Sequence, residues 1–364
     1  MLIRSGLLAL LLIAAAVSPA AARWHEAKTR HFIIYSEQKP KDLADYAERL
    51  ERFDAMVRQI RKMEDPELTD GARVTIYVLP SVSAMQSLYA RPDRRNVLGF
   101  YIPRAAGSVA FVSNRNEERT NGVSAEHIFQ HEYLHHMMLS DTMTPLAPWM
   151  IEGFAEFFGT AEVQKDGSIK IGLPPQSRGY SIVNDFGFNA EQLLTAATPR
   201  NQEDHASIYG KGWLLAHFLS FSDARRGQLD TYVQGLARGQ KPLAAAQAAF
   251  GDLKLLDQQL DRYARGTFRG ALVSPGPKPV VALRPLSAGE EAIMPIRIRS
   301  ERGVNAATAR SVAADASRIA AAFPGHASVQ ASLAEALFDA RDYAGSKAAA
   351  DRAVAADPRH PQAL

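Results

Sequence analysis

Hydrophobic positions at the start of the chain follow two different spacings. Residues 31–36 and 73–79 are short apolar runs with the length of β-strands. Each run is followed by a segment with apolar residues every three or four positions, which predicts helices over 41–62 and from Ser83 onward. Two strand–helix pairs in succession indicate an α/β beginning.

The next segments predict a β-hairpin and a long helix. Residues 97–102 and 108–112 have the pattern of two strands joined by a short turn. The spacing becomes helical from Ser124, the expected N-cap, to about residue 139. A proline-containing loop follows, and then a short helix over 150–158 that Gly159 is expected to close. Further on we expect a small hairpin over 162–171 and helices over 190–197, 206–220, 229–237 and 255–264.

The character of the sequence changes near its C-terminal end. Prolines interrupt residues 270–285, and we expect a linker over 269–303. Alanine fills 22 of the 61 positions in 304–364, and Pro324 and Pro358 lie 34 residues apart. Residues 327–360 resemble one complete tetratricopeptide repeat, which has this period, preceded by a half-repeat over 306–323. An alanine-rich helical hairpin of no particular family is the alternative.

The N-terminal residues have the pattern of an export signal. Arg4 precedes a twelve-residue apolar run, 6–17, and small residues lead to a cleavage site after Ala22. The run is shorter than the roughly 20 residues that a membrane-spanning helix needs, and no other stretch is apolar enough to span. We therefore expect a signal peptide at 1–22 and a periplasmic or secreted protein without a stable membrane span. An uncleaved N-terminal anchor is the alternative.

Composition narrows the possible chemistry. The 364 residues include no cysteine, which excludes disulfides, thiolate metal ligands and cysteine nucleophiles. The 42 Lys and Arg residues nearly balance the 39 Asp and Glu residues, and no dense basic run with interleaved aromatics occurs. Nucleic acid is therefore not an expected partner. Any metal in this chain must be held mainly by histidine and carboxylate.

The predicted helix over 124–139 contains the sequence His131-Glu132-Tyr133-Leu134-His135, an H-E-x-x-H pattern. Histidines four positions apart project from one face of a helix, one turn apart, so both can reach one Zn²⁺. Glu132 lies beside that face, where its carboxylate can take a proton from a metal-activated water. The pattern suggests a catalytic zinc site.

A catalytic zinc site uses three protein ligands, so a third must be found. Glu152 is the best candidate because it lies on the next predicted helix, which is otherwise apolar, and a carboxylate on a buried face needs a partner. Glu156 is one turn further on the same face and is expected to orient a ligating histidine. Asp141 is an alternative ligand, although the turn glycine that would bring it round is missing. Another alternative is that both glutamates simply face solvent.

Together these residues resemble the gluzincin metallopeptidases, the peptidase MA-like superfamily that includes the aminopeptidase N and thermolysin types. The H-E-x-x-H helix is followed by a W-x-x-E-G-x-A-E segment over 149–156. A third segment, Tyr209-Gly210-Lys211-Gly212, is similar to the one whose tyrosine stabilises the tetrahedral intermediate in aminopeptidase N-type enzymes.

The resemblance implies a fold and a set of roles. The fold would be an α+β zincin-like domain over 23–268, with a mixed sheet, an active-site helix and a mostly helical C-terminal part. An all-α tetratricopeptide-repeat tail would follow at 304–364. Zn²⁺ would be the cofactor, with the metal ligands His131, His135 and Glu152 and the catalytic residues Glu132 and Tyr209.

One departure from this family concerns the ends of the substrate. The G-x-M-E-N segment by which aminopeptidases hold a free amino terminus is absent, and residues 106–112 occupy the comparable stretch. We still expect that strand to pair with an extended peptide or protein substrate. The expected function is that of an exported zinc-dependent peptidase whose tail can bind a protein partner. Two alternatives remain, a non-catalytic peptide- or protein-binding module that uses the repeat tail and a hydrolase of a non-peptide amide.

Overall fold

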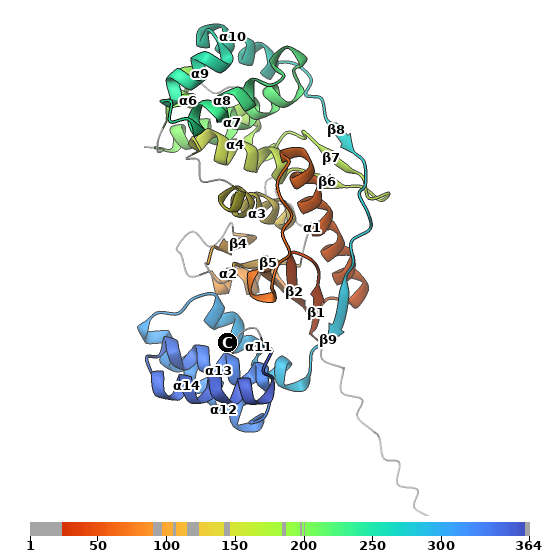
Figure 1. The fold of residues 1–364 in the computed structure, drawn as a ribbon, viewed down its shortest axis with the longest axis vertical. Coiled ribbons are helices and arrows are strands. Elements are labelled where there is room, and N and C mark those ends of the chain that lie inside the picture. Colours follow the sequence, from red (N-terminus) through yellow and green to blue (C-terminus); the bar gives the residue numbers. More distant parts are fainter. Residues whose placement is uncertain are drawn as a thin grey trace, which may run out of the picture.

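The computed structural model describes residues 24–89, 97–104, 107–114, 124–141, 146–183, 187–196, 199 and 201–360. The expected α+β class is confirmed, because a mixed six-stranded sheet is combined with many helices (Figure 1). The expected signal peptide at 1–22 lies outside the described residues. Within the described part of the chain, no helix has both the length and the apolar character needed to cross a membrane.

The main sheet has the strand order β4-β5-β3-β2-β1-β9. Strands β2, β3 and β5 run parallel, whereas β4, β1 and β9 pair antiparallel with their neighbours. Their bounds are β1 His25–Lys28, β2 Phe32–Ser36, β3 Val74–Leu79, β4 Gly99–Ile102, β5 Val109–Ser113 and β9 Ala282–Pro285. The four predicted strands of this region therefore all form.

One expectation about this sheet is wrong. The stretch 106–112 was expected to pair with an extended substrate, but β5, which contains most of it, is hydrogen-bonded to β3 on one side and β4 on the other. Its backbone groups are thus already used by the sheet. The edge strand on this side is β4.

Alternate residues of the central strands face opposite sides of the sheet, as the two-residue period of a strand requires. Ile34 and Ile76 are register partners and belong to the core beneath α1 (Pro40–Arg61) and α3 (Ala125–Asp141). Tyr35 and Tyr77 are also register partners, and they belong to a separate cluster on the opposite face. The sheet therefore has two buried faces.

The second face is covered by α11 (Ala288–Glu301). The rings of Tyr35, Tyr77 and Phe111 stack across three strands, with centroids 5.5 and 5.3 Å apart. The Arg297 guanidinium lies over the Tyr35 ring, 4.7 Å from its centroid. Met294 of α11 packs in the same cluster. The chain therefore returns to its first sheet at β9, about 170 residues after the end of β5.

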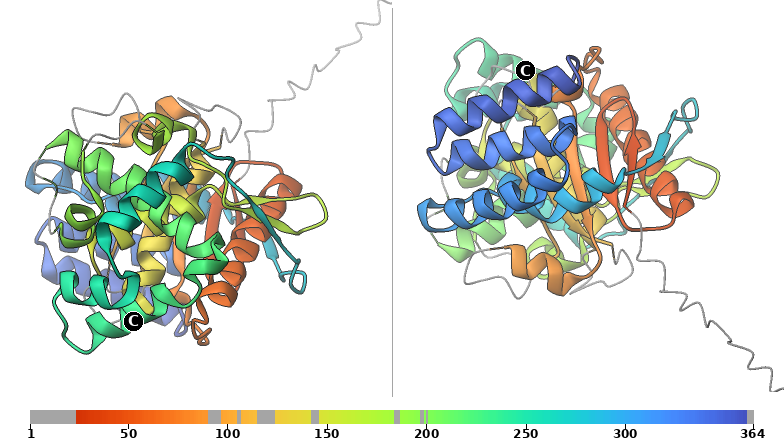
Figure 2. Two further views of the ribbon diagram at one scale, coloured as in Figure 1. Left: turned by 90° about the horizontal axis from the view of Figure 1, so that it is seen from above. Right: turned by 90° about the horizontal axis from the view of Figure 1, so that it is seen from below.

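The segment 269–303, which we expected to be a linker, contains two strands and α11. β8 (Ala271–Val273) pairs with β7, and β9 pairs with β1. Beyond it, α12 (Ala306–Ala322), α13 (Ala327–Asp339) and α14 (Tyr343–Ala356) form an all-helical tail. Figure 2, right, shows these blue helices lying in front of the sheet when the molecule is seen from below.

The middle of the chain is mostly helical. The long α7 (Gln202–Phe221) packs against α4 (Pro148–Gly159), which begins two residues earlier than expected because Pro148 occupies its first turn. Gly159 is the last residue of α4 and does not lie beyond it. The remaining elements are α2 Val82–Leu88, α5 Gly179–Val183, α6 Ala190–Thr195, α8 Gln228–Ala237, α9 Pro242–Phe250 and α10 Leu253–Ala264, with the small hairpin β6 Glu162–Val163 and β7 Ile169–Ile171.

A buried cluster of charges ties α1 to the start of β2. His31 Nδ1 lies 2.8 Å from Glu51 Oε2 and 3.3 Å from Asp54 Oδ2, and its Nε2 lies 3.0 Å from Asp65 Oδ1. Arg58 Nε donates to Asp54 Oδ2 at 2.8 Å. Burial lowers the pKa of His31, but the hydrogen bond to Glu51 and the surrounding carboxylates outweigh this effect and raise the pKa above its usual value.

Replacing His31 by Gln should therefore destabilise the protein in a pH-dependent way. Because the folded-state pKa lies above the unfolded value of 6.5, the contribution of His31 is fully present below that value. It is lost as the pH rises through the folded-state pKa. We expect wild type to exceed His31→Gln by about 1–3 kcal/mol in the free energy of unfolding at acidic pH, and by less at alkaline pH. Urea unfolding across the pH range measures this difference. A difference that does not change with pH would contradict a raised pKa of His31 in the folded state.

Candidate metal centre

The helices α3 and α4 bring His131, His135 and Glu152 together. His131 Nε2 lies 3.1 Å from His135 Nε2, and Glu152 Oε2 lies 3.4 Å from each of these nitrogens. Ligand atoms at the usual distance of about 2.0–2.1 Å from a tetrahedral zinc are separated from one another by about 3.3–3.4 Å. The three atoms are thus spaced like three corners of a zinc coordination tetrahedron.

The chemistry of the three side chains also fits a metal. Glu152 Oε2 is buried and accepts no hydrogen bond from any described residue. Burial raises the pKa of Glu152, but the adjacent imidazoles of His131 and His135 outweigh this effect and lower it well below its usual value, so the carboxylate is anionic. Two imidazoles and one carboxylate are a ligand set that zinc accepts, and such a set leaves a fourth position open.

The two helices that carry Glu152 and Tyr209 touch through their backbones. A Cβ added to Gly153 of α4 would lie 2.5 Å from the carbonyl carbon and oxygen of Gly212 in α7. A Cβ on Gly212 would lie 3.0 Å from the carbonyl oxygen of Trp149. Glycine at both positions therefore permits this close crossing, which explains why each functional segment contains one.

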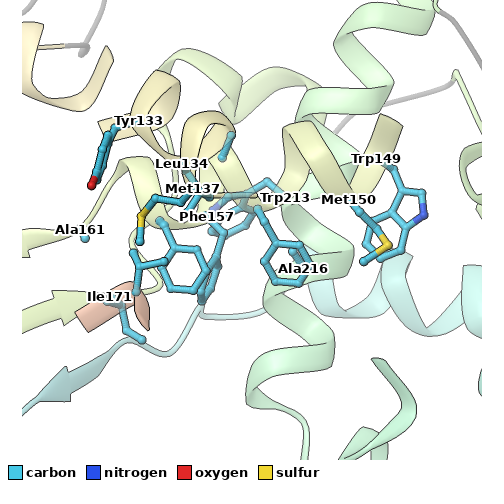
Figure 3. Close-up of a cluster of buried hydrophobic side chains, with 14 of the residues drawn as sticks. Tyr133, Leu134, Met137, Trp149, Met150, Phe157, Ala161, Ile171, Trp213 and Ala216 are labelled. Atoms are coloured by element: carbon cyan, nitrogen blue, oxygen red, sulfur yellow. The ribbon is translucent and has the colours of Figure 1, made fainter. Parts of the chain in front are cut away.

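The crossing continues into an apolar core below the site. Figure 3 shows Leu134 and Met137 of α3, Trp149 and Phe157 of α4 and Trp213 of α7 in one buried cluster. Each of these side chains is 2% exposed or less. The three helices that supply the candidate site are consequently packed as one unit.

Tyr209 of α7 lies beside the three candidate ligands. Its ring is stacked on that of His131, with centroids 5.9 Å apart and an interplanar angle of 7°. Burial raises the pKa of Tyr209, and the nearby carboxylate of Glu152 raises it further. The phenol is therefore protonated at neutral pH and can donate a hydrogen bond.

Glu156 is placed differently from the expectation. Its Oε1 lies 3.8 Å from His131 Nδ1, which is longer than a hydrogen bond. The same oxygen accepts hydrogen bonds from Nε and a terminal nitrogen of Arg178, at 3.0 and 2.9 Å. The Arg178 guanidinium also lies over the Tyr209 ring, 4.6 Å from its centroid. Arg178 therefore connects Glu156 with Tyr209, a role for which the sequence around it carries no motif.

The site opens into a cleft of about 530 Å³. Glu132, His131 and Tyr209 line it, together with a wall formed by residues 173–178. Burial raises the pKa of Tyr101 in β4 to about 12, and the negative charge of Glu132 adds to this rise. Glu132 therefore lies within electrostatic range of Tyr101 in the edge strand. No sequence motif marks Tyr101 or Arg178.

Gly153→Ala should test the helix crossing. The added methyl group would meet the backbone of α7, so we expect a loss of about 1–3 kcal/mol in the free energy of unfolding. Gly179→Ala in α5 is the matched control, because an added Cβ there meets no described atom within 4 Å. Thermal unfolding of both variants measures the effect, and equal stability of Gly153→Ala and wild type would contradict the close contact.

The three side chains that the sequence suggests as metal ligands, those of His131, His135 and Glu152, lie together in the structure. The alternative ligand Asp141 ends α3, and its side chain lies outside the described part of the structure. Comparison with known proteins adds no further assignment, since neither a family model nor a curated protein matches the chain. The candidate site is therefore defined by the convergence of His131, His135 and Glu152 and by the cleft beside them.

Proposed function

We propose that the protein is an exported zinc-dependent peptidase of the gluzincin type. The observation that carries the proposal is the spacing of 3.1–3.4 Å among His131 Nε2, His135 Nε2 and Glu152 Oε2. These three atoms would hold Zn²⁺, which when bound activates water and polarises the scissile carbonyl. The cleft beside them presents Glu132 and Tyr209.

Glu132 is the general base of this proposal. Its carboxylate takes a proton from the attacking water and later delivers that proton to the leaving amine. It suits this role because it follows His131 directly in α3 and lines the cleft. Burial lowers the pKa of His131, but the carboxylates of Glu152, Glu156 and Glu132 outweigh this effect and raise it above its usual value.

Tyr209 is the proposed hydrogen-bond donor to the oxyanion that develops on the substrate. A protonated phenol held by stacking on His131 is ready to donate without reorganising. Arg178 supports it from the cleft side through the contact with its ring. Glu156 has the supporting role of holding Arg178.

The edge strand β4 is the proposed place for the main chain of the substrate. Edge strands carry unpaired backbone groups that can bind an extended peptide as an additional strand. Tyr101 of β4 lies against α3, with its ring centroid 6.0 Å from that of His136. A peptide along β4 would therefore run beside the helix that carries Glu132.

For the finer architecture, we propose a zincin-like domain with a tetratricopeptide-repeat tail. The α13–α14 hairpin is closely packed, since Ser346 Oγ of α14 donates to the carbonyl oxygen of Ala334 in α13 at 2.8 Å. Small residues at such positions suit the close helix pairs of these repeats. In this proposal the leader directs export to the periplasm or outside the cell, and the tail offers a site for a protein partner.

A second candidate function is non-catalytic binding of a peptide or protein through the tail. A groove of about 760 Å³ lies between the sheet and helices α13 and α14. Ala331 and Glu335 of α13 line it, opposite Arg104. This function would be favoured over catalysis if removing residues 304–364 abolished capture of a protein partner while Glu132→Gln left capture unchanged.

Glu132→Gln should abolish most of the hydrolysis while leaving the metal bound. The amide cannot accept the proton, so we expect peptide hydrolysis to fall by about 10²–10⁴-fold. Fluorogenic peptide libraries and elemental analysis of the purified protein measure rate and zinc content. Glu191→Gln on the exposed surface of α6 is the control. Unchanged hydrolysis in Glu132→Gln, or wild type without zinc, would refute the proposal.

Glu152→Gln should weaken zinc binding. Zinc stabilises the folded state more strongly the more tightly it binds, so the rise of Tm on adding zinc to chelator-treated protein should be smaller in this variant than in wild type. Asp141→Asn is the matched comparison, because it separates the two candidate third ligands. An equal rise of Tm in Glu152→Gln and wild type, with a reduced rise in Asp141→Asn, would transfer the role of ligand to Asp141.

A further inference from the structure

Tyr133 lies on the side of α3 that faces away from the candidate metal ligands. Successive residues of an α-helix are turned by about 100°, so Tyr133 is turned by about 200° from His131 and by the same angle, in the opposite sense, from His135. It therefore points directly away from the midpoint between the two imidazoles. Its ring is 1% exposed, and its hydroxyl donates to Asp54 Oδ1 at 2.7 Å.

The acceptor of this hydrogen bond is itself firmly held. Asp54 lies on α1 and is 0% exposed. Its second oxygen accepts from Arg58 Nε at 2.8 Å and lies 3.3 Å from His31 Nδ1. The backbone N–H of His31 donates to Glu51 Oε1 at 2.7 Å. The carboxylate is thus anchored both to α1 and to the start of β2.

The other contacts of Tyr133 are aromatic. Its ring lies 4.9 Å from that of Phe32 and 5.6 Å from that of Phe129, measured between centroids. Such contacts are weakly directional, so they favour burial of this side of α3 without defining its rotation. A hydrogen bond to a buried carboxylate is directional, and leaving that carboxylate without its donor is unfavourable. The Tyr133–Asp54 bond is therefore a buried contact that can define the rotation of α3, together with the ion pair between Arg49 of α1 and Glu126 in the first turn of α3, whose Nε and Oε1 lie 3.1 Å apart.

Small rotations of α3 matter at the metal centre. A histidine Nε2 lies about 6 Å from the helix axis, so a rotation of about 10° would move it by about 1 Å. Metal sites need ligand distances correct within about 0.2 Å and side chains placed within about 0.5 Å. Unlike His131 and His135, Glu152 is carried by another helix, so a rotation of α3 would change both nitrogen-to-oxygen distances.

We propose that Tyr133 and Asp54 are positioning residues of the metal centre, because their hydrogen bond helps to set the rotation of α3 that aims His131 and His135 at Glu152. The inference rests on the proposed metal site. It assigns a function to the charge cluster around His31 that neither the H-E-x-x-H pattern nor the cleft indicates, since these groups lie on the opposite side of the helix.

Cobalt binding to the full chain tests this inference without using activity. Co²⁺ replaces zinc in such sites and its visible absorption reports the coordination geometry. We expect Tyr133→Phe to bind Co²⁺ about tenfold more weakly than wild type, as measured by competition with a chelator, and to show an altered visible spectrum. Asp54→Ala should change affinity and spectrum in the same direction, and the double variant should bind no more weakly than Asp54→Ala, because both changes remove the same bond.

Tyr232→Phe is the matched control. Tyr232 is also fully buried, and its hydroxyl donates to the carbonyl oxygen of Leu194 at 3.5 Å, in the helical region around α8. This variant should bind Co²⁺ like wild type, and circular dichroism verifies that each variant is folded. If Tyr133→Phe does not fold, the Co²⁺ affinity and spectrum of Asp54→Ala decide whether the inference holds. Wild-type affinity and spectrum in folded Tyr133→Phe would overturn the inference alone, whereas wild type that binds neither Co²⁺ nor Zn²⁺ would overturn the metal site and the inference together.

Discussion

The backbone contact between Gly153 and Gly212 is the constraint on which the candidate site depends. It allows α4 and α7 to cross more closely than any side chain would permit. Glu152 precedes one of these glycines directly, and Tyr209 lies one turn before the other. A similar approach occurs between α3 and α4, where a Cβ on Gly159 would lie 3.3 Å from the Cβ of His131. Three helices are thereby brought close enough for His131, Glu152 and Tyr209 to converge.

The polar groups of α3 are divided between two environments. On one side, His131 and His135 meet the carboxylate of Glu152, whose buried oxygen has no hydrogen-bond donor among the described residues. On the other side, the polar group of Tyr133 is fully satisfied within a closed network of charges. Burying a carboxylate is unfavourable unless it is paired. The cluster around Asp54 therefore has its hydrogen bonds within the protein, whereas the cluster of His131, His135 and Glu152 offers three ligand atoms that suit a cation.

Most of the strands and helices, and the convergence of His131, His135 and Glu152, could be predicted from the sequence. The helix α1 and the strands β2 and β3 were predictable because their apolar residues follow a clear period. By contrast, β9 is exposed along its whole length and exists only because it pairs with β1. The helix α11 follows a proline-rich stretch and contains Pro295, so its local pattern is weak. Its place is decided by the aromatic face of the sheet.

The site likewise combines residues that a local sequence pattern predicts with residues that only tertiary contacts place there. The positions of His131 and His135 follow from helix geometry, and a glutamate in an otherwise apolar helix predicts Glu152. Arg178 and Tyr101 come from a short 3₁₀ turn and an edge strand, where no periodic pattern marks them. Tertiary packing brings Arg178 to the cleft and Tyr101 against α3. The interaction of Glu156 with Arg178 was missed for this reason, and a histidine was expected in its place.

The late return of the chain to its first sheet bears on how the protein is made. Strand β1 remains an open edge, and the stacked face of Tyr35, Tyr77 and Phe111 remains uncovered, until residues 282–298 have been synthesised. Open edges and exposed apolar faces favour association between chains. During synthesis, the nascent chain therefore passes through a long interval in which the N-terminal strands present an open edge and an uncovered aromatic face. Completion of the sheet is a late event even though five of its six strands are encoded early.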